Sequence, residues 1–346
     1  TPTETVTPTV TPTVSASAAT PTPTPTETVT PTVTATVTPT PTVTPTPSAV
    51  TVSAFSGSSD QTVRNIDATG NEITAGWPFT NHTATVIAVD VDASGNVYSA
   101  AGNTIRKADP IGNELWNYTG SITEVRDLVV DDNGNVYVGA DTSSDFTVKK
   151  LDTNANLQWT FTGHTSFVHG VAVDSNGTNV YSVSNDDSVR KIDGSTGNEI
   201  TVDSWPFTGH TGRIISVDVD SSGNVYTASE DDTVRKLNSS GAEQWSFTDS
   251  GSASALNAVV VASDGSVVYA GSGHVVKIDG GTGSEITTGW PFTNHTGVIE
   301  DLSLDTSGNV YTASVDNTAK KIDSSGTEQW TFTGHTNDVR SIVAVN

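Results

Sequence analysis

The sequence predicts an all-β fold: a seven-bladed β-propeller of four-stranded blades, preceded by an extended Thr/Pro-rich segment. The first observation is a tryptophan that recurs every 39 to 46 residues and is followed by an aromatic residue two positions later and then Thr. The second is that several strand-like runs fall within each period, and a period of about 40 residues with several strands is typical of a propeller. The seven tryptophans are Trp77, Trp116, Trp159, Trp205, Trp245, Trp290 and Trp330.

The repeating unit is clearest from Arg213 onward. It reads as four runs rich in Val, Ile and Tyr, namely RIISVDVD, NVYTASE, TVRKLN and EQWSFTD. Ser-Gly, Asp-Asp and Ser-Ser-Gly turns separate these runs, as expected for short antiparallel strands. We therefore expect four strands in each blade, with the first run as the inner strand.

The two ends of the propeller complete one blade between them. The string VRSIVAV near the C-terminus is a seventh inner strand with nothing after it. Residues 50–79 supply a second, third and fourth strand with no first strand before them. We therefore expect residues 339–346 to join residues 50–79, which removes exposed sheet edges by closing the ring.

Residues 1–48 form a different kind of segment, built almost wholly from Thr, Pro and Val with Ser and Ala. Proline and β-branched residues disfavour a helix, so we expect an extended chain of roughly 150 Å at about 3.1 Å per residue. This composition is typical of an O-glycosylated stalk, and an undecorated flexible linker is the alternative. The propeller then spans residues 49–346. The candidate O-glycosylated residues are Thr1, Thr3, Thr5, Thr7, Thr9, Thr11, Thr13, Thr20, Thr22, Thr24, Thr26, Thr28, Thr30, Thr32 and Thr34.

The composition limits which partners the protein can bind and in which compartment it is expected. The 39 Asp and Glu against 15 Lys and Arg give a net charge of -24, which would repel nucleic acid and an anionic membrane surface. There is no cysteine, no apolar run long enough to span a membrane, and no methionine, so we expect a removed secretion signal upstream of Thr1. Together with five N-x-[ST] sequons, these features favour an extracellular protein on a cell or virion surface. The sequons begin at Asn81, Asn117, Asn176, Asn238 and Asn294.

Three strands of the repeat resemble the WD40 family. GHT occurs at Gly163, Gly209 and Gly334, NHT occurs at Asn81 and Asn294, and a Val/Ile-rich strand follows each. The resemblance implies a structural network that joins each His to a turn Asp and a strand Ser or Thr. By spacing we expect pairs of His164 with Asp186, His210 with Asp231, His295 with Asp316, and His335 with Asp60 through the closure. Asp145 occupies the same position, and the sixth blade carries neither residue of the pair.

The position of the tryptophan resembles a second family. The WD tryptophan is replaced by an aliphatic residue, as in VRKID, and the tryptophan comes later, as in GAEQW and GTEQW. This placement is similar to that in PQQ-type propellers, and it implies that the Trp rings dock adjacent blades. No PQQ site follows from the repeat, and we expect no cofactor. The replaced positions are Ile66, Ala108, Leu151, Ile192, Leu237, Ile278 and Ile322.

The sequence lacks the common short motifs of catalytic sites. The sequence holds no G-x-S-x-G, H-E-x-x-H or phosphate loop, so we expect a protein that is not an enzyme. DVDASGN and DVDSSGN faintly resemble a calcium loop, with Asp90 and Asp92 or Asp218 and Asp220 as ligands, although the final glutamate is missing. A hairpin turn explains the same residues. A propeller lyase or quinoprotein dehydrogenase is the least favoured alternative.

One column of the inner strands varies while the framework repeats. One residue after the first apolar position, the blades carry Ile87, Arg126, His169, Ile215, Asn257, Glu300 and Arg340. By the WD40 resemblance this column lies near the rim of one face, where partners dock, and such variable positions suit specificity. We call Arg126, His169, Asn257, Glu300 and Arg340 the rim residues and predict that they contact a partner. The alternative is that they are solvated residues under no constraint.

Two non-enzymatic functions follow from these features. In the first, the Thr/Pro segment packs against neighbouring propellers, as an added edge strand, and builds an extracellular filament or surface appendage. In the second, it is a passive stalk, and the rim binds a glycan or a protein as an adhesin or lectin-like module does. The expected partners are copies of this chain or another surface protein, with glycans as a possibility.

Overall fold

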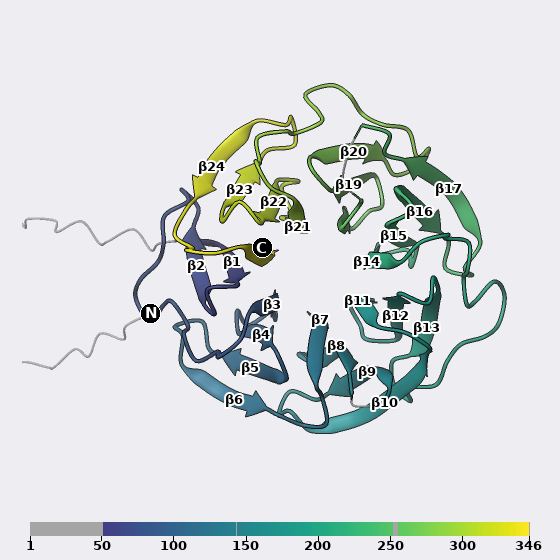
Figure 1. Cartoon of the computed structure of the whole chain (residues 1–346), viewed down its shortest axis with the longest axis horizontal. Helices are drawn as coiled ribbons and strands as arrows, with labels where there is room; N and C mark the ends of the chain where they lie inside the picture. Colours follow the sequence, from purple (N-terminus) through teal and green to yellow (C-terminus); the bar gives the residue numbers. More distant parts are fainter. Residues whose placement is uncertain (1–50, 143, 252–254, 346) are drawn as a thin grey trace, which may run out of the picture. The chain divides into compact units, whose positions relative to one another are not determined.

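The protein folds into seven β-sheets arranged radially around a central channel, as the computed structural model shows in Figure 1. The structure describes residues 51–142, 144–251 and 255–345. The prediction of an all-β seven-bladed propeller is therefore confirmed. The predicted stalk, residues 1–48, and its candidate O-glycosylated threonines lie outside the described residues. We number the blades 1 to 7 by their order around the ring, starting with the blade that holds the first described strand.

The inner strands line the channel, and each combines buried residues with half-buried ones. This mixture arises because each strand packs partly between sheets and partly faces the channel. No helix in the described part of the chain is long and apolar enough to cross a membrane. From blade 1 to blade 7 the inner strands are β25 (Val339–Ala344), β3 (Val86–Val91), β7 (Glu124–Val130), β11 (Val168–Val173), β14 (Ile214–Val219), β18 (Ala258–Val261) and β21 (Ile299–Leu304).

The second strands are the most deeply buried part of each blade. In blades 2, 3, 5 and 7 every residue of this strand is buried, because both faces pack against neighbouring sheets. Val, Tyr and Ala fill these positions, as expected for a strand covered on both sides. The second strands are β1 (Val52–Ser58), β4 (Val97–Ala101), β8 (Val136–Asp141), β12 (Asn179–Ser184), β15 (Val225–Ser229), β19 (Val267–Gly271) and β22 (Val310–Ser314).

The third strands mix buried aliphatic residues with buried or half-buried Lys and Arg. Their cationic side chains reach along the sheet toward polar groups, while the apolar residues fill the space between blades. The third strands are β2 (Val63–Asp67), β5 (Thr104–Ala108), β9 (Phe146–Leu151), β13 (Val189–Asp193), β16 (Thr233–Leu237), β20 (Val275–Asp279) and β23 (Ala319–Ile322).

The predicted fourth strand is regular in four blades and reduced to isolated bridges in the other three. In blades 1, 4 and 6 the segment reads Trp-Pro-Phe, and the Phe pairs with the third strand only through a single bridge, such as that of Phe79 with Val63. Proline has no N–H to extend the ladder, which accounts for the interruption. The regular fourth strands are β6 (Glu114–Tyr118), β10 (Leu157–His164), β17 (Glu243–Thr248) and β24 (Glu328–Phe332).

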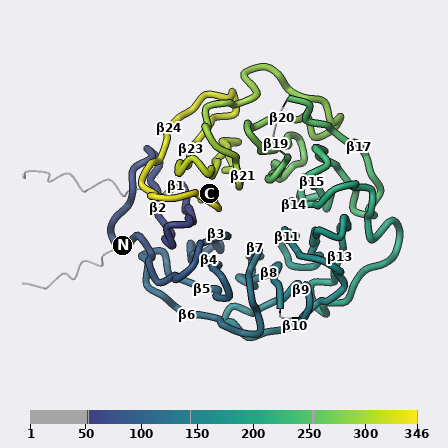
Figure 2. Tube along the Cα trace, in the orientation of Figure 1, coloured from purple at the N-terminus to yellow at the C-terminus, as the bar shows by residue number. Residues whose placement is uncertain are grey.

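The closure of the ring is confirmed. Strand β25 pairs antiparallel with β1, with Ala344 opposite Ala54 and Val339 opposite Ser58. Figure 2 shows the C-terminal strand lying beside the first described strands in the same blade. The inner strand of blade 1 therefore comes from the C-terminal end of the chain, as the count of strands predicts.

The tryptophans dock each blade onto the next, as the PQQ-type resemblance implies. The Trp159 indole N–H of blade 3 donates to the Gly194 carbonyl of blade 4 at 3.1 Å, and the Lys150 ammonium donates to the same oxygen at 2.8 Å. A Cβ added to Gly197 would lie within 3 Å of the Trp159 ring, so glycine lets the two blades approach closely. Shared acceptors of this kind recur at the Ser239, Gly280 and Ser324 carbonyls.

The interface between blades 7 and 1 departs from this pattern. The Trp330 indole nitrogen is buried and has no hydrogen-bond partner among the described residues. Its ring packs against Gly70 of blade 1, while Lys321 turns back to Asp305 of its own blade at 3.3 Å. The closing interface thus has the ring packing without the shared acceptor.

This difference predicts that Trp-to-Phe substitutions at these two interfaces lower the free energy of unfolding by unequal amounts. Trp159 and Trp330 are both 8 % exposed, so replacing either with Phe removes a similar area of ring. Only Trp159→Phe breaks a hydrogen bond, and we expect it to lower the free energy of unfolding by about 1 kcal/mol more than Trp330→Phe. Urea unfolding of the two variants, followed by circular dichroism, measures the difference. Equal costs would show that the indole bond contributes nothing.

Candidate functional site: the mouth of the central channel

The inner strands enclose a cavity of about 540 Å³ that opens at the mouth of the channel. All five rim residues line it, together with Ile87 and Ile215 from the same column. The structure therefore brings the predicted candidates together around one opening. Their contact with a partner stays a prediction.

The charged rim residues are engaged with one another and with nearby carboxylates. Arg126 Nε lies 3.0 Å from Asp141 Oδ2, its NH2 lies 3.2 Å from Glu124, and its guanidinium stacks 4.7 Å from the centre of the Phe167 ring. Phe167 is 38 % exposed, so this cation–aromatic pair is open to solvent.

A second cluster of ion pairs joins blades 7 and 1 at the same mouth. Arg340 NH1 lies 3.1 Å from Glu300, and its NH2 lies 2.8 Å from Asp338. Two of the rim residues thus hold each other in place across a blade interface. The rim presents fixed, internally compensated charges.

His169 and Asn257 differ from the charged rim residues. Both are half-buried, and His169 Nε2 has no hydrogen-bond partner among the described residues. Burial lowers the pKa of His169, so the neutral imidazole is favoured at this position. The His169 side chain therefore lines the cavity, while its Nε2 is buried from solvent.

Four aspartates on the inner strands each form hydrogen bonds from their own blade to the next one. Asp127 of blade 3 accepts the N–H of Leu128 on its own strand and the N–H of Val171 on blade 4, both at 2.8 Å. Asp301 accepts the Ile342 N–H of blade 1 in the same way, at 2.9 Å. We call Asp90, Asp127, Asp218 and Asp301 the channel aspartates.

Serine hydroxyls accept the same kind of bond at three places, and two interfaces have neither a channel aspartate nor a serine. Ser341 accepts a backbone N–H between blades 1 and 2, whereas Ser216 and Ser303 add a second bond at the interfaces of Asp218 and Asp301. At the corresponding positions, blade 4 carries Gly170 and Ala172, and blade 6 carries Ala258 and Val260, none of which has a side-chain oxygen. The inner ring of hydrogen bonds is therefore uneven.

The enclosure of the channel aspartates shifts their titration toward neutral pH. Burial raises the pKa of Asp90 and of Asp127 to about 7, against the opposing effect of the backbone N–H bonds. Burial likewise raises the pKa of Asp218 and of Asp301 to about 6. Repulsion among these carboxylates adds to the effect, so their protonated forms are favoured more than in water.

The residues of the suggested calcium loops have separate partners. Asp90 faces the backbone of blade 3, whereas Asp92 accepts hydrogen bonds from Asn96 and Tyr98 and lies 3.3 Å from the Lys107 ammonium. In blade 5, Asp220 likewise bonds Asn224 and Tyr226, away from Asp218. Within the described ranges, no group of three or more His, Cys, Asp or Glu is placed to hold a metal ion.

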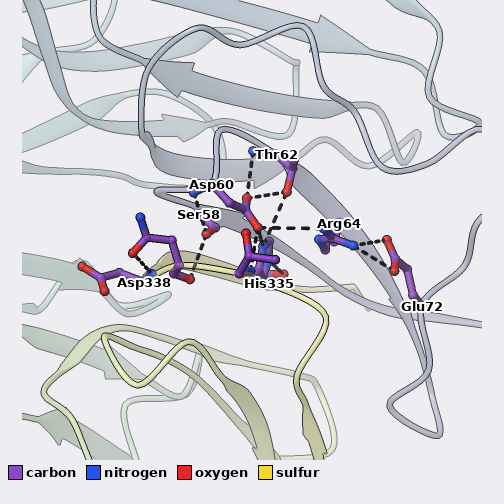
Figure 3. A network of polar contacts seen from close by, with 10 residues as sticks. Ser58, Asp60, Thr62, Arg64, Glu72, His335 and Asp338 are labelled. Carbon is purple, nitrogen blue, oxygen red and sulfur yellow. Dashed lines mark hydrogen bonds and ion pairs between the residues drawn. The ribbon is translucent and has the colours of Figure 1, made fainter.

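The predicted His–Asp pairs are confirmed in blades 1, 4, 5 and 7. His335 Nδ1 lies 3.0 Å from Asp60 Oδ2, and its Nε2 lies 2.8 Å from the Ser56 hydroxyl. Figure 3 shows this network, in which Asp60 also accepts a bond from Thr62. Burial alone would raise the pKa of Asp60, but these hydrogen bonds more than offset it and hold the pKa well below its usual range. The other pairs are His164–Asp186 at 2.9 Å, His210–Asp231 at 3.0 Å and His295–Asp316 at 2.8 Å.

Blades 3 and 6 differ from this network. Blade 6 lacks the His and the Asp of the motif, as expected, and instead places Asp249, one residue before the His position, 3.5 Å from His274. Asp145 bonds its neighbours Ser144 and Thr142, because blade 3 has Ser121 in the His position. The Asp249–His274 contact has a longer spacing in the sequence than the motif, so the motif does not predict it.

The His335–Asp60 pair predicts that losing His335 destabilises the protein more than losing His82, which has no Asp partner. His82 in blade 2 packs 5.7 Å from Phe79, as His335 does from Phe332, and bonds Ser99, but its Nδ1 has no partner among the described residues. We expect His335→Ala to lower the free energy of unfolding by about 1–3 kcal/mol more than His82→Ala, because it leaves the Asp60 carboxylate without its imidazole partner. Thermal unfolding at pH 7 provides the comparison, and matching losses would contradict a role for the Asp bond.

The raised pKa of Asp127 predicts a pH dependence of defined sign. Its pKa is about 7 in the folded protein and about 3.8 in the unfolded chain, so the folded state binds more protons between these values. Stability of the native protein relative to Asp127→Asn should therefore fall as the pH rises from about 4 to about 7. Ser303→Ala, which removes a neutral bond of the same ring, should show an offset that does not vary with pH. Urea unfolding across this range tests both, and a constant offset for Asp127→Asn would contradict the shift.

Comparisons with known proteins agree with this architecture. A model of the PQQ-like repeat, described as outer membrane protein assembly factor BamB, matches residues 144–289 and 230–346. A second model, described as a beta-propeller repeat, matches residues 111–147. A search of curated proteins finds no match. The BamB-type model covers more than half of the chain, and the Trp docking between blades agrees with it, so the chain belongs to the family of PQQ-like β-propellers.

Proposed function

We propose that this chain is a non-enzymatic, extracellular structural protein, a propeller subunit of a filament or surface appendage linked through its Thr/Pro segment. The observation that carries the proposal is that the propeller closes without that segment. Strand β25 supplies the inner strand of blade 1, so the described residues close the ring by themselves. We therefore infer that the Thr/Pro segment serves a neighbouring molecule.

The outer edges of the propeller give such a segment places to bind. Strands β6, β10, β17 and β24 are the terminal strands of their sheets and lie at the perimeter in Figure 1. An edge strand carries unpaired backbone N–H and C=O groups that an extended peptide can join. Alternating Thr with Val or Pro suits an added strand with one polar face, which supports assembly of one copy on the next.

The polar groups of the channel support a structural role over catalysis. Each channel aspartate is bonded to backbone amides of two blades, and Arg126 and Arg340 are held by carboxylates beside them. These groups therefore stabilise the ring. An enzyme would need an additional group poised toward a substrate, and the unpartnered Nε2 of His169 is buried from solvent.

A stalked adhesin or lectin-like module is the second candidate. The observation that favours it is the gathering of the rim residues around one cavity, with the exposed Phe167 stacked on Arg126. An aromatic ring beside polar and charged groups suits a sugar or a protein loop. In this candidate the Thr/Pro segment is only a spacer.

Electron microscopy of three forms distinguishes the two candidates. We expect the full chain to form regular filaments, and a chain starting at Val50 to remain as single discs. A third form, with residues 1–48 replaced by a Gly/Ser segment of equal length, should also remain as discs, because a flexible tether cannot add a strand. Filaments from the truncated chain, or discs from the full chain, would overturn the filament proposal. If the protein then binds a glycan or another protein, and Arg126→Ala and His169→Ala abolish that binding, the adhesin is favoured.

A further inference from the structure

One turn on the propeller breaks the repeat in a chemically specific way. After the inner strand, blades 2, 3, 5 and 7 have a five-residue turn that runs from Asp to Asn, such as Asp131–Asn135. Blade 4 has six residues, Asp174–Asn179, between β11 and β12. The extra residue is Thr178, and it turns Asn-Gly into the acceptor sequence Asn176-Gly177-Thr178.

The turn presents this acceptor to solvent. Asn176 and Thr178 are both exposed, and Gly177 between them has a φ of 71°, which glycine adopts without strain. Asn176 Oδ1 accepts the Thr178 backbone N–H at 3.0 Å, while its amide nitrogen makes no hydrogen bond among the described residues. The side-chain nitrogen and the Thr178 side chain are therefore both open on one tight turn.

The sequons at Asn81 and Asn294 are less available. Their amide nitrogens donate to Glu114 and Glu328, at 2.8 Å and 3.3 Å. Each is followed by a buried His, His82 or His295, so modification would disturb a packed position.

The other two sequons are also constrained. Asn238 Oδ1 accepts three bonds, from the Ser240 N–H, the Ser240 hydroxyl and the Ala242 N–H, so its amide oxygen and the sequon hydroxyl are engaged, and both residues are half-buried. Asn117 lies within β6, where its backbone pairs with Arg106. Asn176 is the sequon that lies in a turn with both its Asn and its Thr exposed and with no hydrogen bond to the amide nitrogen among the described residues.

We propose that Asn176 is an N-glycosylation site. In the transfer, the Asn176 amide nitrogen forms a bond to the anomeric carbon of an oligosaccharide, whose bond to a lipid-linked phosphate breaks. The amide loses one proton, and the lipid phosphate leaves with the bonding electrons. The donor is a lipid-phosphate-linked oligosaccharide, and the inference rests on the proposed extracellular location, where such chains are found.

The place of the site sets where the sugar lies. Asn176 lies in the turn after β11, whereas the rim residue His169 is near the beginning of that strand, about 13 Å from its end at Val173. The glycan therefore occupies the face opposite the channel mouth. It solubilises that face and leaves the rim accessible.

Blade 6 provides a matched control in the same geometry. Its turn also has six residues, Ala262–Val267, and Asp264 stands where blade 4 has Asn176. Asp264 Oδ1 accepts the Ser266 N–H at 2.9 Å, and Gly265 has the same φ of 71°. Asp264→Asn therefore creates the sequence Asn-Gly-Ser in an equivalent turn.

The test uses the full chain secreted from a eukaryotic cell line that N-glycosylates secreted proteins. Trypsin releases residues 151–190, which contain Asn176 as their one sequon. Mass spectrometry before and after enzymatic glycan release, which converts a modified Asn to Asp, reads the occupancy. We expect the native chain and Thr178→Ser to be modified, Thr178→Ala to be unmodified, and Asp264→Asn to gain a second glycan, separated from Asn238 by cleavage after Glu243.

The outcomes separate this site from the filament proposal. An unmodified Asn176 in secreted protein overturns the site, even if filaments form. A modified Asn176 in a protein that forms only discs supports the site and counts against the filament. Modification of Thr178→Ala would also overturn the inference, because it would not depend on the sequon hydroxyl.

Discussion

The pairing of β25 with β1 is the contact on which the other blades depend. Each blade buries its faces against two neighbours, so a gap anywhere in the ring exposes apolar surface on both sides of the gap. Because β25 comes from the far end of the chain, this pairing joins residues almost three hundred positions apart, such as Ala54 and Ala344. The His335–Asp60 pair lies at the same place, so the junction is held by backbone and side-chain hydrogen bonds together.

Much of the fold could be predicted because each of its features recurs at a regular spacing in the sequence. The spacing of Trp159 and its six counterparts gives the number of blades, and the unpaired inner strand at the C-terminus gives the closure. His335 could be matched with Asp60 because the closure restores the spacing found in the other blades. Patterns that repeat seven times are readable even when one copy is imperfect.

The features that were not predicted have no such repeated pattern in the sequence. The partners of Asp127 are backbone N–H groups, one of them about forty residues away, and a backbone group has no residue type to recognise. The contact of Asp249 with His274 keeps a His–Asp interaction in blade 6 but lies outside the positions of the motif. The loss of a regular fourth strand depends on a single proline, whose effect is decided by its place at the sheet edge.

Both ends of the propeller lie in blade 1, and this decides how it would respond to tension along the chain. A pull applied at Thr51 and at Val345 acts on the same end of the antiparallel pair, because Ala54 faces Ala344. The two strands would be peeled apart one hydrogen bond at a time, instead of being sheared all at once. The applied force acts on blade 1 and does not load the other six blades. In a string of such propellers, blade 1 would open first and release length before the hydrogen bonds within the other blades carry any load.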